Sequence, residues 1–480
     1  MKKQFILLTL GILCLGTLVY ARPKENIASE KQKNVLFIAV DDLRLQAGIF
    51  GQSMMHTPGL DRLGEEGIVF NRAYCNVPVC GASRASLMSG VRPTNTRFIN
   101  YHTKKDVDLP DVPSLAKWFK QNGYQTFSNG KIYHHTNDDL EAWSEKPFNP
   151  ARNKHGEKWG MYQKPESIEI IKTTKKKPAW EDADVDDNGY PEGLLAEKVI
   201  GDLKKLSKQD KPFFLSVGFW DPHLPFNAPK KYWDLYNPED IKLADNPYKP
   251  EGAPDEAMHR WSELRKYYGM PDAGNMDDET AKKLIHGYYA SVSYTDAQIA
   301  KLLNTLDELG LRENTIVVLW GDHGWHLGEH SLWCKHCNFD RVMNAPLFVS
   351  APGYSKGVKT NSITEFIDIY PSLCELCELP LPEHLDGTSF VPVLENPAKS
   401  VKDYAYIRYH KGESVVSENY NYTEWFNYKS GNVDANMLYD LKKDPKENTN
   451  VSESNQYNST VKKMSGLLSN MRKQLSEKSK

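Results

Sequence analysis

Residues 34–42 read NVLFIAVDD, and this stretch decides the fold class. Its unbroken apolar run stops abruptly at the paired acids Asp41 and Asp42. A continuous apolar run is typical of a strand that is buried on both faces of a parallel sheet. Two similar runs lie at 213–219 and 315–320, and polar residues follow each of them directly.

Helical patterns separate these runs. Residues 113–122 begin with a proline suited to a first helical turn, and Gly123 follows them. Residues 284–309 carry apolar side chains at helical spacing before Gly310. Strands that alternate with long helices predict an α/β fold with a large, doubly wound sheet flanked by helices. In such sheets, ligands bind beyond the carboxyl ends of the strands.

The composition is that of a large globular protein. Of 480 residues, 40% are hydrophobic and 11% aromatic, which excludes a disordered or collagen-like chain. The net charge of −3, from 60 Lys+Arg and 63 Asp+Glu, is not typical of a nucleic-acid-binding protein. Outside the N-terminus, no apolar run approaches the roughly 20 residues that span a membrane. We therefore expect an enzyme with no nucleic-acid partner and no membrane span.

The N-terminus has the pattern of a secretory signal peptide. Lys2 and Lys3 precede an apolar stretch from Phe5 to Val19, and the segment ends in the small residue Ala21. Polar sequence follows at once, so this stretch is not expected to anchor the chain in a membrane. We predict a signal peptide over residues 1–21 and export of the chain, to the periplasm or the medium if its source is bacterial.

The rest of the chain divides by its patterns into two parts. We predict a main catalytic domain over residues 22–360 and a smaller C-terminal α+β subdomain over residues 361–480. Short β-like runs characterise the second part, at 404–409, 420–426 and 437–441. Within the first part, 140–191 and 234–277 are rich in polar residues or proline, and are predicted to be surface insertions that select the substrate.

Acidic residues and a histidine follow two of the predicted strands. Asp41 and Asp42 end the first strand, and Asp322 and His323 end the 315–320 strand. An Asp pair after a strand more often caps a helix. Here the matching acid and imidazole at a second strand end favour a shared site. Because its donors are mostly oxygen, the site suits Ca²⁺ better than zinc.

Segment 80–93 reads CGASRASLMSGVRP. If Cys80 begins a helix, Arg84 lies on the same face one turn later. The helix N-terminus and the guanidinium then favour an anion at residue 80. A cysteine at a helix start is more often simply buried in the core.

Cationic side chains follow other strands. Lys131 and His134 come after the predicted strand 124–128, and His223 comes after the strand 213–219. Taken alone, each is more typical of a surface lysine or a hydrogen-bonded histidine. The same holds for Lys335.

Segment 80–93 resembles the signature of the sulfatases of the alkaline-phosphatase superfamily, Cys-x-Pro-Ser-Arg followed by Leu-x-[Ser/Thr]-Gly. Ala82 stands at the usual proline position. Further motifs resemble the iduronate-2-sulfatase branch, and the likeness spans about residues 34–450: DDLR at 41–44, RPTNTR at 92–97, GKIYH at 130–134, PHLPF at 222–226, DHGWHLGEH at 322–330, LDGTS at 385–389 and LYDL at 438–441. Asp221 stands where that branch more often carries lysine.

The resemblance implies an alkaline-phosphatase-like fold and hydrolysis of sulfate esters on the sugars of a sulfated oligo- or polysaccharide. A maturation enzyme would convert Cys80 to formylglycine, whose hydrated aldehyde is the nucleophile. One Ca²⁺ per chain would be bound by Asp41, Asp42, residue 80, Asp322 and His323. The resemblance implies roles for four further residues beside Arg84 at the nucleophile. Lys131 and Lys335 would bind sulfate, His134 would orient or deprotonate the formylglycine hydroxyl, and His223 would protonate the leaving alcohol.

Three alternatives remain open at this stage. The chain could be a phosphoesterase or phosphonate hydrolase of the same superfamily, or a glycan-binding protein in which Cys80 stays unconverted. The pairs Cys334–Cys337 and Cys374–Cys377 also have the spacing of zinc ligands. Lys335 lies inside the first pair at a position needed for sulfate, and exported cysteines more often pair or stay buried.

Overall fold

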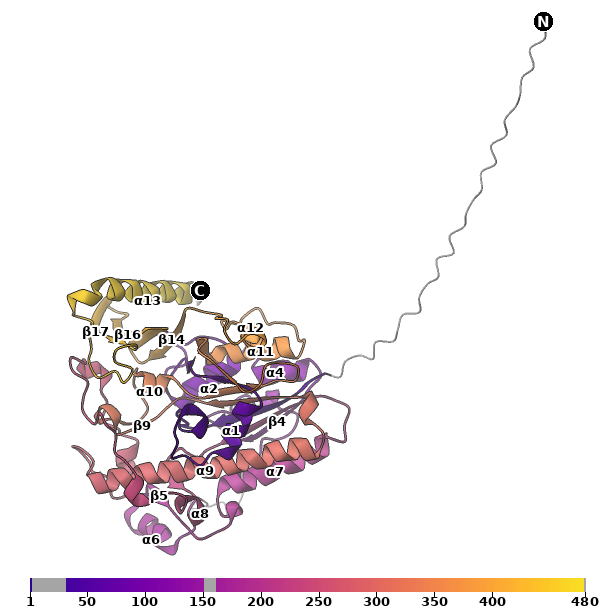
Figure 1. Ribbon diagram of the computed structural model, residues 1–480, viewed down its shortest axis with the longest axis horizontal. Coiled ribbons are helices and arrows are strands. Elements are labelled where there is room, and N and C mark those ends of the chain that lie inside the picture. The colour runs from indigo at the N-terminus through magenta and orange to yellow at the C-terminus, as the bar shows by residue number, and fades with distance from the viewer. Residues whose placement is uncertain (2–31, 151–160, 479–480) are drawn as a thin grey trace. The chain divides into compact units, whose positions relative to one another are not determined.

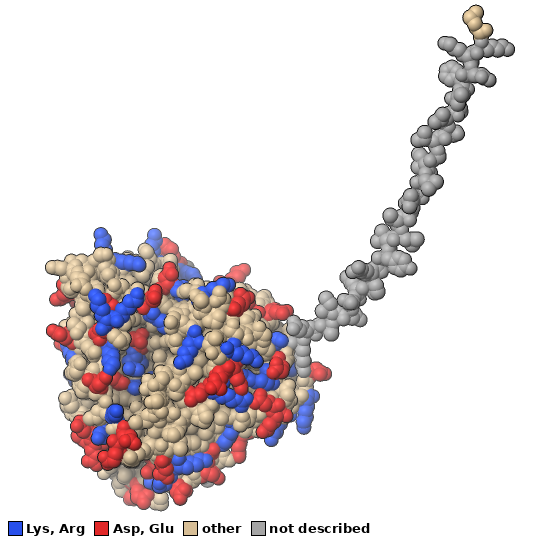
Figure 2. Space-filling view, viewed as in Figure 1, with Lys and Arg blue, Asp and Glu red and all other residues tan. Residues whose placement is uncertain are grey.

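A computed structural model describes residues 1, 32–150 and 161–478, and the described residues from Lys33 onward form one compact unit. Apart from Met1, the predicted signal peptide lies outside the described residues. Among the described residues, no helix is both long and apolar enough to cross a membrane. Basic and acidic side chains are interspersed over the face shown in Figure 2, in keeping with the small net charge.

A central sheet of seven strands has the order β12-β2-β11-β8-β1-β6-β4. Strand β1 pairs in parallel with β6 and β8, and β4 pairs in parallel with β6, whereas β11 is antiparallel to both β8 and β2. The sheet is therefore mixed, and its parallel half, β8-β1-β6-β4, consists of the four strands predicted from the sequence. Its strands are β1 Asn34–Val40, β2 Ile68–Phe70, β4 Gln125–Gly130, β6 Phe213–Phe219, β8 Thr315–Gly321, β11 Leu347–Ser350 and β12 Val358–Thr360.

Strand β1 is apolar from Val35 to Val40 because both faces of the sheet are covered (Figure 1). Leu36 and Ile38 pack into a core with helices α1, α7 and α9, whereas Val35 and Phe37 pack into a second core with α2, α4, α11 and α12. The predicted α/β fold with a helix-flanked large sheet is thus confirmed. These helices are α1 Pro58–Glu65, α2 Cys80–Ser89, α4 Leu115–Gln121, α7 Pro191–Leu206, α9 Asp278–Glu308, α11 Ile369–Leu376 and α12 Val391–Glu395.

Two predicted helix boundaries differ from the structure for reasons of capping. Helix α4 begins after Ser114, whose hydroxyl accepts a hydrogen bond from the Lys117 amide, so Pro113 lies before the cap. Helix α9 begins before the predicted residue 284, because the Asp277 carboxylate accepts the Thr280 amide and opens the helix there.

The C-terminal part is a four-stranded antiparallel sheet covered by helix α13 (yellow in Figure 1). Its strands are β14 Tyr404–Tyr409, β15 Gly412–Ser417, β16 Tyr420–Asn427 and β17 Asn432–Asp440, and α13 spans Asn458–Lys478. The three predicted β-like runs lie in β14, β16 and β17. The other strands form three short pairs: β3 Ala73–Tyr74 with β13 Thr364–Glu365, β5 Trp180–Glu181 with β7 Phe226–Asn227, and β9 His326–Leu327 with β10 Trp333–Cys334. The other α-helices are α3 Lys105–Asp108, α6 Pro165–Thr174, α8 Lys230–Trp233 and α10 Asp340–Met343.

Candidate active site

Four neighbouring parallel strands of the central sheet end in polar side chains. In the order β4, β6, β1 and β8, their carboxyl ends lead to Lys131, His223, the pair Asp41 and Asp42, and Asp322. Because these strands are parallel, all of the residues lie along one edge of the sheet, where ligands bind in folds of this class.

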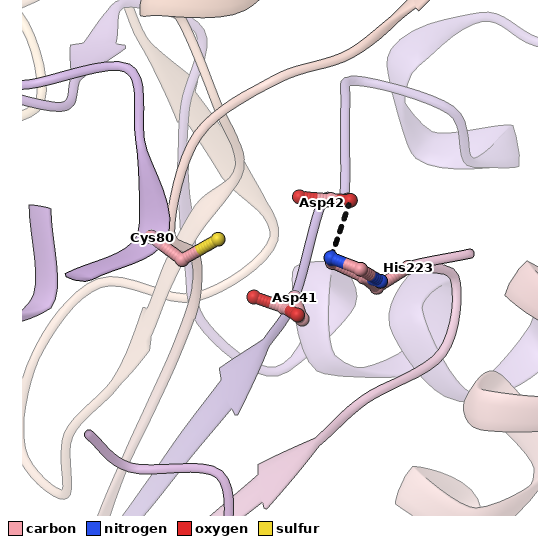
Figure 3. Close-up of side chains that lie close together, drawn as sticks. All are labelled: Asp41, Asp42, Cys80 and His223. Atoms are coloured by element: carbon pink, nitrogen blue, oxygen red, sulfur yellow. Dashed lines mark ion pairs between the residues drawn. The ribbon is translucent and has the colours of Figure 1, made fainter. Parts of the chain in front are cut away.

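Cys80 lies among these strand ends. It is the first residue of α2, and its side chain is buried. The next position, 81, requires glycine, because a Cβ atom there would lie 2.5 Å from the Tyr101 carbonyl oxygen. The Cys80 sulfur and one potential ligand atom from each neighbour form two groups, and all atoms of a group lie within 4.8 Å of one another. One group is Asp41, Asp42, Cys80 and His223 (Figure 3), and the other is Cys80, Asp322 and His323.

Arg84 joins the carboxylates of two strand ends. Its guanidinium donates to Asp322 Oδ2 at 2.9 Å and to Asp41 Oδ1 at 3.0 Å. It also donates to the carbonyl oxygens of Lys131 and Ile132, and its side chain is fully buried. The residue that the spacing placed beside Cys80 therefore fixes the acidic residues around it. Asp41, Asp42, Arg84, Lys131, Asp322 and His323 are called the strand-end cluster below.

Lys131 forms an ion pair with Asp41. Burial raises the pKa of Asp41, but the charges of Lys131 and Arg84 outweigh burial and hold this pKa well below its usual value. Burial likewise raises the pKa of the Cys80 thiol, and Lys131 and Lys335 outweigh it, so the net shift is downward. Both groups are thus set up to carry negative charge.

Asp42 contacts a second lysine. The Nζ atom of Lys335 lies 3.0 Å from both carboxylate oxygens of Asp42, and the lysine side chain is only 2% exposed. Burial nevertheless dominates and raises the pKa of Asp42 to about 7. A carboxylate in this position needs more positive charge than the protein supplies, which is the situation of a metal ligand.

His323 has the hydrogen bonding of a metal ligand. Its Nδ1 atom donates to the Gly324 carbonyl oxygen at 3.0 Å, which fixes the ring and turns Nε2 toward the carboxylates of Asp42 and Asp322. Burial lowers the pKa of His323, but these carboxylates outweigh burial and raise this pKa to about 9, so Nε2 would release a proton on binding a cation. Nε2 is buried and has no hydrogen-bond partner among the described residues. It lies 3.5 Å from Asp42 Oδ1 and 3.7 Å from Asp322 Oδ1. An unpartnered imidazole nitrogen between carboxylate oxygens fits a divalent cation, and the oxygen-rich donor set fits Ca²⁺.

His223 makes hydrogen bonds through both ring nitrogens. Nδ1 donates to the Leu224 carbonyl oxygen at 2.6 Å, and Nε2 lies 2.9 Å from Glu263 Oε1 and 3.8 Å from Asp42 Oδ2 (dashed in Figure 3). A carbonyl and a carboxylate only accept, so this arrangement requires an imidazolium. Burial lowers the pKa of His223, but the surrounding carboxylates outweigh burial and raise this pKa to about 9.

His134 has the opposite character. Its Nδ1 atom is buried and has no hydrogen-bond partner among the described residues. Burial and the charge of Lys131 lower the pKa of His134 to about 3, so the ring is neutral at neutral pH. His134 as a neutral imidazole can accept a proton, and His223 as an imidazolium can donate one.

Glu263 is the residue of this site that the sequence did not reveal. It belongs to the predicted insertion 234–277, and its carboxylate contacts His223 at 2.9 Å and Lys335 at 3.0 Å. Burial raises the pKa of Glu263, but Lys335 and His223 hold it well below its usual value. No motif marks Glu263, because its position depends on how a long insertion returns to the sheet edge.

Neither Cys-x-x-Cys pair belongs to a potential metal-ligand group of the described residues. Cys334, Cys337, Cys374 and Cys377 are all buried and free, as is Cys75. Lys335 points from between the first two of these cysteines to Asp42.

Acidic and imidazole side chains thus surround a buried cysteine at the carboxyl ends of the parallel strands of a mixed α/β sheet. Residues 33–379 match the sulfatase family, and residues 328–474 match the family described as N-sulphoglucosamine sulphohydrolase, C-terminal. Human iduronate 2-sulfatase is 33% identical over 398 residues, which cover 77% of this chain and 70% of that protein. The chain belongs to the sulfatase family and is a sulfuric ester hydrolase.

Solved structures agree on the fold. A protein in complex with its substrate D-glucosamine-2-N,6-O-disulfate superimposes with a TM-score of 0.75 at 21% identity, covering 93% of this chain and 99% of that chain. A phosphonate monoester hydrolase from Silicibacter pomeroyi superimposes with a TM-score of 0.76 at 20% identity, covering 92% and 96%. The family match and the human relative confirm the predicted resemblance to sulfatases, and the solved structures share the fold.

Proposed function

We propose that the chain is an exported, Ca²⁺-dependent sulfatase that uses formylglycine at position 80 to hydrolyse O-sulfate esters on the sugars of sulfated polysaccharides. One observation carries the proposal. A buried cysteine at a helix start lies within 4.8 Å of acidic and imidazole ligand atoms from three different strand ends. The signal-peptide pattern of residues 1–21 supports export.

Residue 80 would be the nucleophile. A cysteine thiolate that attacked a sulfate ester would form a sulfur–sulfur adduct that is hard to discharge. Formylglycine supplies a hydrated aldehyde, of which one hydroxyl attacks sulfur while the other later expels sulfate. The start of α2 and the charges of Lys131 and Lys335 favour negative charge at this position. A maturation enzyme is therefore an implied partner.

The strand-end cluster would hold the cation. Asp41, Asp42, Asp322, His323 and residue 80 supply the ligands, and a bound Ca²⁺ would neutralise charge on the nucleophile and the sulfate. Arg84 would keep Asp41 and Asp322 oriented, because its guanidinium bridges their carboxylates.

The remaining cations would bind the ester and move protons. Lys131 and Lys335 are buried ammonium groups that can donate to sulfate oxygens. His134, neutral at neutral pH, would accept a proton from the nucleophile. His223, an imidazolium, would protonate the leaving alcohol oxygen, since a sugar alkoxide departs poorly without a proton.

A cavity beside the site has room for a sugar. It has a volume of about 680 Å³ and is lined in part by Lys131, His134, Trp143, Lys198 and Trp220. Indole rings pack against the apolar faces of sugars, and lysines suit anionic substituents. Because the relatives include an iduronate 2-sulfatase, we propose 2-O-sulfated uronic acids, or similar sugars of glycosaminoglycan or algal oligosaccharides, as the substrate class.

We further propose that residues 22–360 form the catalytic domain and residues 361–480 a supporting subdomain. The residues proposed for chemistry all precede position 360, and the C-terminal sheet follows it.

Two measurements test the proposed function. Mass spectrometry of the peptide that contains residue 80, from protein made in a competent host, should show an aldehyde in place of the thiol. Release of sulfate from a panel of defined sulfated oligosaccharides should then identify the substrate. Unmodified Cys80 in a fully active enzyme would contradict the proposal, as would absence of desulfation by protein that carries the aldehyde.

A further inference from the structure

Glu263 adds a negative charge to a site that binds an anion. Its carboxylate lies 2.9 Å from Nε2 of His223 and 3.0 Å from Nζ of Lys335, and its side chain is 21% exposed. Lys335 does not need this partner to be neutralised, because it already contacts both oxygens of Asp42 at 3.0 Å. Neutralising Lys335 therefore does not account for the Glu263 carboxylate at this place.

The other two cations beside residue 80 also have acidic partners. Lys131 is paired with Asp41, and Arg84 bridges Asp41 and Asp322. Glu263 is the acid that faces the imidazolium of His223 most closely, since the next carboxylate, Asp42, is 3.8 Å away. Removing the charge of Glu263 would thus leave the outer side of the site more positive by one unit.

An ester bound at this site would lie close to Glu263. Lys335 is proposed to bind a sulfate oxygen and His223 to protonate the leaving oxygen, and these two oxygens are bonded to the same sulfur. A group that contacts both nitrogen atoms must approach the carboxylate that contacts them now. Every negative charge on the ester group is therefore repelled by Glu263.

Sulfate and phosphate monoesters differ mainly in that charge. A sulfate monoester carries one negative charge, whereas a phosphate monoester carries about −1.5 to −2 at pH 7, because its second pKa is about 6. Both groups are tetrahedral, so shape alone separates them poorly. A fixed carboxylate penalises the doubly charged ester more than the singly charged one.

We propose that Glu263 is a specificity-determining residue whose carboxylate selects singly charged sulfate esters over doubly charged phosphate monoesters. The inference rests on the proposed function, because it assumes that His223 and Lys335 hold the ester. It assigns a task to the insertion 234–277, which brings this acid to the sheet edge.

The test compares two substrates that share one leaving group, 4-nitrophenyl sulfate and 4-nitrophenyl phosphate, with the metal-loaded, converted full-length enzyme above the second phosphate pKa. Glu263→Gln should raise the phosphate-to-sulfate ratio of kcat/KM by about tenfold, the effect of a removed like charge at a few ångströms. Glu263→Ala should raise the ratio similarly, and Glu263→Asp, which keeps the charge, should leave the ratio within about twofold of the wild type.

Glu256→Gln is the matched control, because Glu256 is an exposed acid of the same insertion. Its ratio should equal that of the wild type. An unchanged or lower ratio in both Glu263→Gln and Glu263→Ala would overturn the inference, as would an equal rise in Glu256→Gln. A failure of the proposed function would give a different result. In that case Cys80→Ala would keep its turnover, whatever the phosphate-to-sulfate ratio in the Glu263 variants.

Discussion

Two buried charge clusters of this chain have similar residues and different hydrogen bonding. The strand-end cluster surrounds Cys80 at the edge of the central sheet. The second, called the Glu365 cluster, lies where the end of α2 meets the start of α11 and the C-terminal sheet, and consists of Arg92, Glu365, Asp368 and Lys402.

The acceptors of the Glu365 cluster are all used. Glu365 Oε1 accepts from Asn76 at 2.8 Å and from Arg92 at 3.1 Å, and Oε2 accepts from Lys402 at 2.6 Å. Asp368 accepts the Glu365 amide at 2.8 Å through Oδ2, and Lys402 at 2.7 Å through Oδ1. Such a complete network positions elements and leaves nothing for a ligand.

In the strand-end cluster, by contrast, not every hydrogen-bonding atom has a partner. His323 Nε2 is buried and has no hydrogen-bond partner among the described residues. The comparison teaches that buried charge alone does not mark a site. Unused ligand atoms that converge on a nucleophile do.

Cys80→Ala should have the largest effect on activity. It removes the proposed nucleophile, so turnover should fall to background on every substrate. The substitution removes one sulfur atom and leaves the strand-end cluster around it unchanged, so the thermal unfolding midpoint should stay close to that of the wild type. Sulfate release and differential scanning calorimetry measure the two properties, and full activity in this variant would exclude the mechanism.

Removing divalent cations should have the second-largest effect on activity. Exhaustive chelation should abolish sulfate release, and Ca²⁺ should restore it better than Zn²⁺, because the ligands are mostly oxygen. Asp42→Ala should mimic chelation and should not be rescued by added Ca²⁺. Metal analysis of the chelated protein is the control, and full turnover by a demonstrably metal-free enzyme would contradict the assignment.

His223→Ala should lower kcat on sugar sulfates by about 10²–10⁴-fold, the usual value of general-acid catalysis. On an aryl sulfate, whose phenolate leaves without a proton, the loss should be much smaller. Lys335→Ala is the matched comparison, because it should impair both substrates to a similar extent. Equal losses for His223→Ala on the two substrates would assign His223 to sulfate binding instead.

The pH dependence of kcat should show the same difference between sugar sulfates and aryl sulfates, with a smaller change in kcat. The pKa of His223 is raised to about 9, so the imidazolium is present below that pH and lost above it. Activity on sugar sulfates should therefore decline as the pH rises through about 9. Activity on aryl sulfates should show no such decline, and parallel profiles for both would point to another titrating group.

Arg92→Ala should have the smallest effect on kcat and a large one on stability. Removing one partner of a buried ion pair typically costs about 3–5 kcal/mol. The loss here should lie near the lower end of that range, because Lys402 and Asn76 still donate to Glu365. Urea unfolding should show this loss, while kcat per folded molecule stays near that of the wild type. A loss of kcat with unchanged stability would mean that the Glu365 cluster takes part in catalysis.

The sequence by itself determined the parallel half of the sheet and the strand ends that carry the chemistry. A strand such as 34–40 is apolar on both faces because helices cover both, and that burial is recorded in the composition of the strand itself. Cys80 could be placed at a helix start from local spacing, since Arg84 and Gly90 lie within one short helix and its cap.

Only the tertiary structure decided the partners across the site. Arg84 meets Asp322 over a separation of 238 residues, and Lys335 meets Asp42 over 293. Which oxygen each cation contacts depends on packing that no local pattern encodes. Glu263 is the clearest case, because it comes from an irregular insertion without periodicity, and its closeness to His223 and Lys335 arises from the path of the folded chain.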